Sequence, residues 1–109
     1  MTVYLCGSFK FYDEMKAVYN ELTSEKISCS MSEPDNTDGI VGCLNKIKQT
    51  EILYVINPDG YVGKSVALDI GYALGLNRKI YAINKISDPP ISNLIDGVIS
   101  PRELIDLAK

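Results

Sequence analysis

The chain has 109 residues, of which 46% are hydrophobic and 23% charged, and its mean hydropathy is +0.02. This length and composition are typical of one globular domain that is large enough to bury a core. The net charge of -3 and the isoelectric point of about 4.8 argue against a general nucleic-acid-binding protein. They still allow one small anionic ligand held by backbone N–H groups.

The residue types present narrow the possible chemistry. The chain contains no histidine, which excludes Ser-His and Cys-His catalysis and imidazole metal ligands. The chain has three cysteines, Cys6, Cys29 and Cys43. Because their number is odd and they are widely spaced, they fit neither a zinc motif nor a disulfide framework. We interpret Cys6 and Cys29 as buried strand residues in a reducing cytoplasm and expect neither metal nor cofactor. Since no signal peptide or membrane-length apolar run is found, we expect a cytoplasmic protein without membrane contact.

Apolar runs alternate with helical periodicity in the first half of the chain. Residues 2–6 predict a strand, and the apolar spacing from residue 12 to residue 26 predicts a helix. A short second strand is expected over residues 27–31. Residues 32–38 form a polar loop with several helix-capping candidates, Asp38 among them, and a second helix follows over residues 40–47.

The second half continues the same alternation. A strand is expected over residues 52–56, a helix over 64–76 and a strand over 79–83. After them we expect a turn-rich loop over 88–93, a weak strand near 97–99 and a short helix after Pro101.

Strands alternating with helices predict a single α/β domain over residues 1–109, a doubly wound parallel sheet with helices on both faces. Right-handed crossovers give the strand order 2-1-3-4, with a possible fifth strand at the edge. Ligands of such sheets bind beyond the carboxyl ends of the strands, where the order changes direction. That crevice lies between the first and third strands, beside the turns 7–10 and 57–65.

The most informative segment is 52–75, in which an apolar strand leads through a Gly-rich turn into a helix. This layout binds phosphates at helix N-termini. One interpretation is a P-loop, but Gly-x-x-x-x-Gly-Lys-Ser requires a glycine where Pro58 stands. Proline lacks the N–H that a phosphate nest needs, and no strand ends in the Asp of a second Mg²⁺-binding motif. We therefore disfavour a P-loop.

The other interpretation is a nucleotide site with Asp69 as its working group. Ser65 and Asp69 are four residues apart, hence on one face of the helix, and a carboxylate facing the crevice can act as a nucleophile. Each candidate also has a structural explanation: Asp69 as a charge early in a helix, Tyr4 as core, Ser65 as a cap. Their convergence on one crevice favours a site.

Three segments carry a family resemblance. Tyr4-Leu-Cys-Gly-Ser-Phe-Lys10 resembles the first strand and turn of the nucleoside 2-deoxyribosyltransferase superfamily, especially its 2'-deoxynucleoside 5'-phosphate N-hydrolase branch. Asp69-Ile-Gly-Tyr-Ala-Leu-Gly75 resembles the helix of that superfamily that reads Glu-Leu-Gly-x-Ala, and the segment from Pro90 to Val98 resembles its C-terminal part more loosely. The resemblance spans nearly the whole chain in order and spacing.

The resemblance implies roles for individual residues. Asp69 stands at the position of the nucleophilic Glu, and Tyr4 at that of the tyrosine which positions this carboxylate. Ser8 matches a contact to the 5'-phosphate, and Lys10 takes the place of an arginine. Cys43 aligns with the second acid, which assists departure of the base. The site predicted in this way has Asp69 and Tyr4 as catalytic residues and the following substrate-binding residues: Gly7, Ser8, Phe9, Lys10, Cys43, Gly60, Gly63, Lys64 and Ser65.

We therefore expect an enzyme that cleaves or transfers the N-glycosidic bond of a nucleoside or nucleoside 5'-monophosphate. The base, the sugar (ribose or deoxyribose) and the acceptor (water or a second base) stay open. The alternatives are a non-catalytic nucleotide-binding module with the same crevice and a purely structural interaction domain. The resemblance also implies a homodimer or larger assembly, with Ser92, Asn93 and Ser100 completing a neighbour's site.

Overall fold

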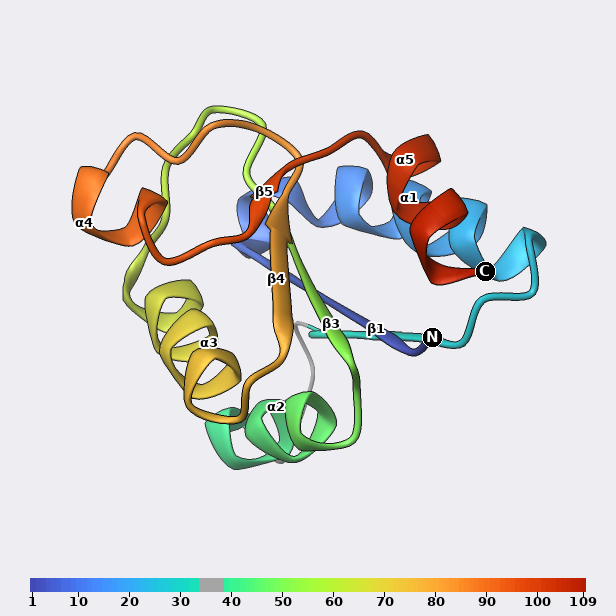
Figure 1. Ribbon diagram of the computed structural model, residues 1–109, viewed down its shortest axis with the longest axis horizontal. Helices are drawn as coiled ribbons and strands as arrows, with labels where there is room; N and C mark the ends of the chain where they lie inside the picture. The colour runs from blue at the N-terminus through green and yellow to red at the C-terminus, as the bar shows by residue number, and fades with distance from the viewer. Residues whose placement is uncertain (34–38) are drawn as a thin grey trace.

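The structure is a computed structural model that describes residues 1–33 and 39–109, and it is a five-stranded parallel sheet with helices on both faces (Figure 1). The sheet order is β2-β1-β3-β4-β5, so the predicted α/β class and strand order are confirmed, with the fifth strand at the edge. In chain order the elements are β1 (Val3–Gly7), η1 (Phe9–Phe11), α1 (Tyr12–Ser24), β2 (Cys29–Met31), α2 (Gly39–Lys48), β3 (Ile52–Ile56), α3 (Lys64–Gly75), β4 (Lys79–Ala82), α4 (Pro89–Ser92), β5 (Gly97–Val98) and α5 (Pro101–Ala108).

The core has two halves, one on each face of the sheet. Helices α1 and α5 cover one face, and α2 and α3 cover the other (Figure 1). Alternating side chains of β1 enter the two halves: Val3 and Leu5 pack with α1 and α5, whereas Tyr4 and Cys6 pack with α2 and α3. Because every residue of β3 is buried, this strand is the nearly continuous apolar run typical of a strand covered on both faces.

Three details differ from the sequence-based expectation. Helix α1 ends at Ser24 because the chain turns at Lys26, whose φ of 64° lies in the left-handed region. The predicted loop 88–93 contains the one-turn helix α4, which Asp88 caps by accepting a hydrogen bond from the N–H of Ile91 at 3.2 Å. Cys6 is buried as expected, but Cys29 is only partly buried, since β2 is the edge strand of the sheet.

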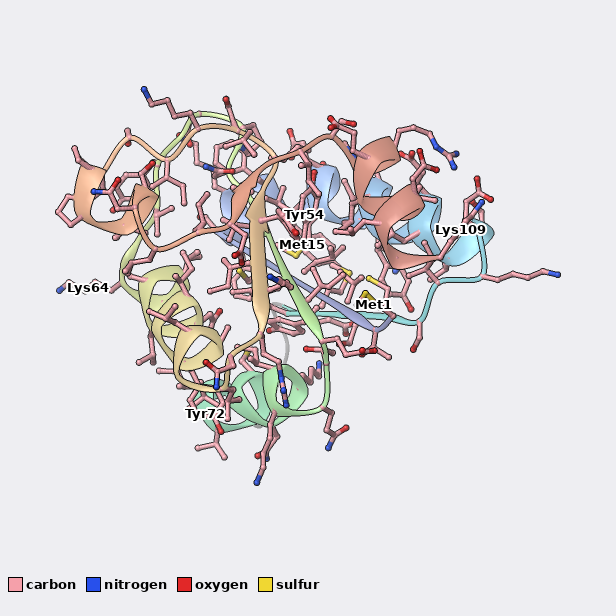
Figure 2. The ribbon with its side chains drawn as sticks, in the orientation of Figure 1. Met1, Met15, Tyr54, Lys64, Tyr72 and Lys109 are labelled. Carbon is pink, nitrogen blue, oxygen red and sulfur yellow. The ribbon has the colours of Figure 1, made fainter. Side chains whose placement is uncertain are left out.

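The predicted cap Asp38 and its neighbours 34–37 lie outside the described residues. In the described parts of the chain, no helix combines the length and the hydropathy that crossing a membrane requires. Figure 2 shows Met15 and Tyr54 inside the molecule, where both belong to the core under α1 and α5, whereas Lys64 extends outward from the start of α3. The start of α3 is therefore open to the surface.

Candidate functional site

A cavity of about 590 Å³ lies at the carboxyl ends of β1 and β3, where the strand order changes direction. Its wall includes eight of the residues predicted from the sequence: Gly7, Ser8, Phe9, Cys43, Gly63, Lys64, Ser65 and Asp69. The turn after β1, helix α2 and the start of α3 therefore come together around one cavity, as the topology predicts.

Three predicted residues lie outside the wall of this cavity. Tyr4 is fully buried behind it. Lys10 is 73% exposed, with its ammonium 4.0 Å from Asp59. Gly60 is buried in the turn after β3 with a φ of 82°, and a Cβ there would lie 2.9 Å from the carbonyl oxygen of Lys85. Gly60 therefore allows the turn to close rather than meeting a ligand.

Asp69 is the buried carboxylate of the cavity wall, since only 7% of the residue is exposed. Burial raises the pKa of its carboxyl group from 3.8 to about 6, because the charged form is poorly solvated there. Among the described residues, no side chain or backbone group donates a hydrogen bond to it. Asp69 is thus an ionisable group that faces a cavity without a described partner, an arrangement common at functional sites.

The N-terminus of α3 opens into the same cavity. Its N-cap is Gly63, which offers no side-chain hydrogen bond, so Ser65 is not the cap that a purely structural explanation would require. The N–H groups of the first turn have no intrahelical acceptor. Together with the dipole of the helix, these groups favour an anion at this end of the cavity.

A second polar cluster consists of Ser32 and Cys43 in the cavity wall and of Tyr4 behind it. The hydroxyl group of Tyr4 is 2.5 Å from the Oγ atom of Ser32, and that Oγ atom is 3.8 Å from the Sγ atom of Cys43. Burial raises the pKa of Tyr4 well above its usual range, and the neighbouring Cys43 and Asp69 raise it further. Within the described residues, the Tyr4 hydroxyl lies within hydrogen-bond distance of Ser32, whereas the resemblance implies that Tyr4 positions the carboxylate of Asp69.

The turn after β3 is held in place by the segment after β4. The side chain of Asn57 donates to the carbonyl oxygen of Asn84 at 3.0 Å and accepts from its N–H at 3.2 Å. The hydroxyl of Ser87 donates to the carbonyl oxygen of Gly60 at 3.1 Å, and the N–H of Tyr61 donates to Asp59 at 3.0 Å. These bonds fix the turn that carries one side of the cavity.

The cavity wall also includes three residues that the sequence patterns did not indicate, Ser32, Glu33 and Tyr61. A usable signal existed for the first two, because they directly follow the second strand and the carboxyl ends of parallel strands share one edge. Glu33 gives the cavity wall a second carboxylate besides Asp69. Within residues 1–33 and 39–109, no three side chains of metal-ligating type gather closely enough to hold a metal ion.

The sheet order and the cavity at its switch point define the chain as a doubly wound α/β domain. No family model matches the chain, and no curated protein matches it. Several solved structures match the chain. A conserved protein from Enterococcus faecalis is 12% identical with a TM-score of 0.75, and the match covers 97% of this chain and 95% of that one.

Two further solved structures share the fold of this chain. The 2-deoxyribosyltransferase of Bacillus psychrosaccharolyticus is 16% identical, with a TM-score of 0.67 and coverage of 97% of this chain and 91% of that one. The CMP N-glycosidase of Clostridium botulinum is 13% identical, with a TM-score of 0.62 and coverage of 98% and 97%. The fold that the resemblance implied is confirmed.

Proposed function

We propose that this protein cleaves or transfers the N-glycosidic bond of a nucleoside or nucleoside 5'-monophosphate, with Asp69 as the nucleophile. The observation that carries the proposal is the buried carboxylate of Asp69 in the wall of a cavity of about 590 Å³, a size that suits a mononucleotide. The likeness of the fold to a 2-deoxyribosyltransferase and a CMP N-glycosidase supports it.

In the proposed reaction, the carboxylate of Asp69 attacks C1' of the sugar. The bond between C1' and the base nitrogen breaks, its electron pair stays on the base, and the base acquires a proton. The product is a glycosyl ester of Asp69. Water then attacks C1' and releases the sugar in a hydrolase, or a second base attacks in a transferase. Only the ionised carboxylate is a nucleophile, so Asp69 must lose its proton first.

The 5'-phosphate would lie at the N-terminus of α3. The open N–H groups after Gly63 and the hydroxyl groups of Ser8 and Ser65 supply donors around this end of the cavity. Lys64 lines it as well and adds a positive charge, which suits a phosphate. These features support a monophosphate over an uncharged nucleoside.

The direct test is base release. The protein is incubated with the ribo- and deoxyribonucleoside 5'-monophosphates, and the free base is followed by chromatography. Asp69→Asn is expected to lower turnover about a thousandfold or more, the usual scale for loss of a nucleophile. Asp13→Asn, an exposed position on α1, is the matched control. Absence of base release from the unaltered protein, or full activity in Asp69→Asn, would contradict the catalytic proposal.

The second candidate is a nucleotide-binding module that does no chemistry. The observation that favours it is Cys43 in the cavity wall, at the position where the resemblance implies an acid, because a thiol is a weak hydrogen-bond donor. In that case nucleotides raise the melting temperature, since they bind only the folded state, and no base is released. The two candidates differ in turnover alone, so both measurements are made on the same preparation.

A further inference from the structure

Ser32 directly follows β2 and has no role in the proposed reaction. Ser32 is 6% exposed and lines the cavity. Tyr4, in the neighbouring strand β1, is 0% exposed, and its hydroxyl lies 2.5 Å from the Oγ atom of Ser32. A buried serine hydroxyl held from behind by a tyrosine is a polar group of fixed position in a cavity wall.

Either hydroxyl group can be the donor of this hydrogen bond, and the arrangement that leaves the proton of Ser32 free for a ligand is the one in which Tyr4 donates. Because burial raises the pKa of its hydroxyl, Tyr4 keeps its proton at neutral pH and can donate it to Ser32. The Oγ atom of Ser32 then accepts from Tyr4, and its own proton points elsewhere. The nearest described acceptor is the Sγ atom of Cys43 at 3.8 Å, and sulfur is a weak acceptor. A carbonyl oxygen or ring nitrogen in the cavity would accept that proton better.

The place of Ser32 identifies the part of the ligand that it meets. Asp69 belongs to α3 and Ser32 follows β2, and the cavity wall includes both. Ser32 also contacts Cys43, the residue at the position that serves the base in the resembled superfamily. The sugar-phosphate end is assigned to the turn after β1 and the start of α3, which leaves the nucleobase beside Ser32.

We propose that Ser32 donates a hydrogen bond to an acceptor atom of the departing nucleobase and that Tyr4 is a positioning residue for Ser32. This inference rests on the proposed function. As the N-glycosidic bond breaks, its electron pair moves onto the base, and the negative charge spreads to the ring nitrogens and carbonyl oxygens. A donor placed there stabilises this charge. Ser32 keeps its proton throughout, and the proton that the base acquires comes from water.

Binding isolates the contact to the base. In the Asp69→Asn background, which prevents turnover, the affinity for each nucleoside 5'-monophosphate is compared with that for 2-deoxyribose 5-phosphate, which lacks a base. Ser32→Ala is expected to weaken nucleotide binding about three- to tenfold, as for one lost hydrogen bond, and to leave the sugar phosphate unchanged. Ser32→Thr keeps a hydroxyl group and is expected to restore the affinity for the nucleotide. Ser28→Ala is the matched control, because Ser28 lies outside this cavity.

Turnover isolates the leaving group. Ser32→Ala is expected to slow base release most for the bases that leave least readily, by about ten- to a hundredfold, and Tyr4→Phe should act in the same direction. Tyr54→Phe is the control for Tyr4, because Tyr54 is a buried tyrosine whose hydroxyl donates to the carbonyl oxygen of Ile99 at 2.7 Å, in the opposite half of the core. A merely structural role of Tyr4 would slow all substrates equally.

Three results would overturn the inference. In the first two, Ser32→Ala loses affinity equally for the nucleotide and the sugar phosphate, or loses affinity for neither. The third is a base-dependent loss of affinity in Glu33→Gln that is absent in Ser32→Ala. If the unaltered protein binds nucleotides but releases no base, the catalytic proposal fails, and the binding comparison still decides the role of Ser32. If base release occurs and Ser32→Ala leaves it unchanged, the role of Ser32 fails alone.

Discussion

Ionisation of Asp69 at neutral pH lowers the stability of the folded protein. In the unfolded chain its pKa is near 3.8, and burial raises the pKa in the folded protein to about 6. The folded state therefore holds the proton more tightly, and ionisation of Asp69 destabilises the fold. The penalty is absent below pH 3.8, develops as the pH rises from 3.8 to about 6, and is complete above about 6. A buried carboxylate that lowers stability in this way is expected at a functional site.

Asp69→Asn should accordingly stabilise the protein at neutral and alkaline pH. The expected gain in the free energy of unfolding at pH 8 is about 2–3 kcal/mol, from 1.36 kcal/mol for each pH unit between the two pKa values. At pH 4 the gain should nearly vanish. Denaturant titrations of both proteins across this range check it, with Asp13→Asn as control. A gain that is the same at every pH would show that the cause is not ionisation.

The same pKa predicts how base release depends on pH. Because the proposed mechanism requires the ionised form of Asp69, the rate at low substrate concentration should rise tenfold per pH unit below about pH 6 and level off above it. Initial rates between pH 4.5 and 8.5 measure this profile. A rate that falls across this range would be incompatible with Asp69 as the nucleophile.

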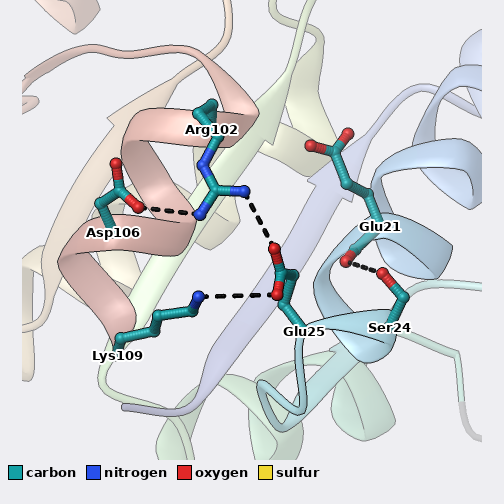
Figure 3. Close-up of polar contacts among 6 residues, drawn as sticks. All are labelled: Glu21, Ser24, Glu25, Arg102, Asp106 and Lys109. Atoms are coloured by element: carbon teal, nitrogen blue, oxygen red, sulfur yellow. Dashed lines mark hydrogen bonds and ion pairs between the residues drawn. The ribbon is translucent and has the colours of Figure 1, made fainter.

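Helix α5 is attached to the rest of the domain by ion pairs on one side and by buried apolar side chains on the other. Arg102 lies between Glu25 of the α1–β2 connection and Asp106, at 2.9 Å from each, and Lys109 lies 3.5 Å from Glu25 (Figure 3). These exposed pairs lower the pKa of Glu25, chiefly through the hydrogen bond from Arg102. On the other side of α5, Leu104 is fully buried against the sheet. Burial, more than charge, holds α5 in place.

Leu104→Ala is expected to lower the free energy of unfolding by about 2–5 kcal/mol, because it leaves a cavity in the core. Arg102→Ala should cost clearly less, and its effect should shrink further in 1 M salt, where exposed charges are screened. Urea titrations at low and high salt measure both. If Arg102→Ala were the more damaging change, the ion pairs would be the main attachment of α5.

The turn between β3 and α3 depends on one glycine. Gly60→Ala should destabilise the protein by about 1–2 kcal/mol or more, because its φ of 82° is left-handed and the added Cβ meets the carbonyl oxygen of Lys85 at 2.9 Å. Gly71→Ala is the matched control: Gly71 lies in α3, and an added Cβ finds nothing within 4 Å. That change should stabilise by about 0.5–1 kcal/mol. Denaturant titrations that rank the two variants in the opposite order would contradict this account of the turn.

For the whole molecule, both halves of the core share one sheet, so the domain should unfold in a single transition. Its assembly in solution stays a prediction from the resemblance, which implies a dimer or larger. Several apolar side chains of α2 and α3 are exposed in the single chain, namely Ile40, Val41, Leu68 and Leu74. Light scattering should therefore give at least twice the chain mass of 12.0 kDa. A mass of one chain would leave any site completed by Ser92, Asn93 or Ser100 of a neighbour without support.

The sequence by itself determined the order of the elements, the parallel sheet and the place of the crevice. These follow from local signals: an unbroken apolar strand at 52–56, helical spacing over 64–76, and Gly-containing turns after the first and third strands. The position of Asp69 on the cavity side of α3 followed as well, because residues four apart share one face of a helix and Ser65 lies beside the turn.

Only the tertiary structure decided which groups meet. The register of the parallel strands sets Tyr4 of β1 opposite Ser30 of β2, so that Ser32, two residues further along the same face, comes within reach of the Tyr4 hydroxyl. That pairing joins residues 28 positions apart and depends on how two strands align, which no local pattern encodes. Burial of the Asp69 carboxylate likewise depends on α3 packing against the sheet, and this packing raises its pKa.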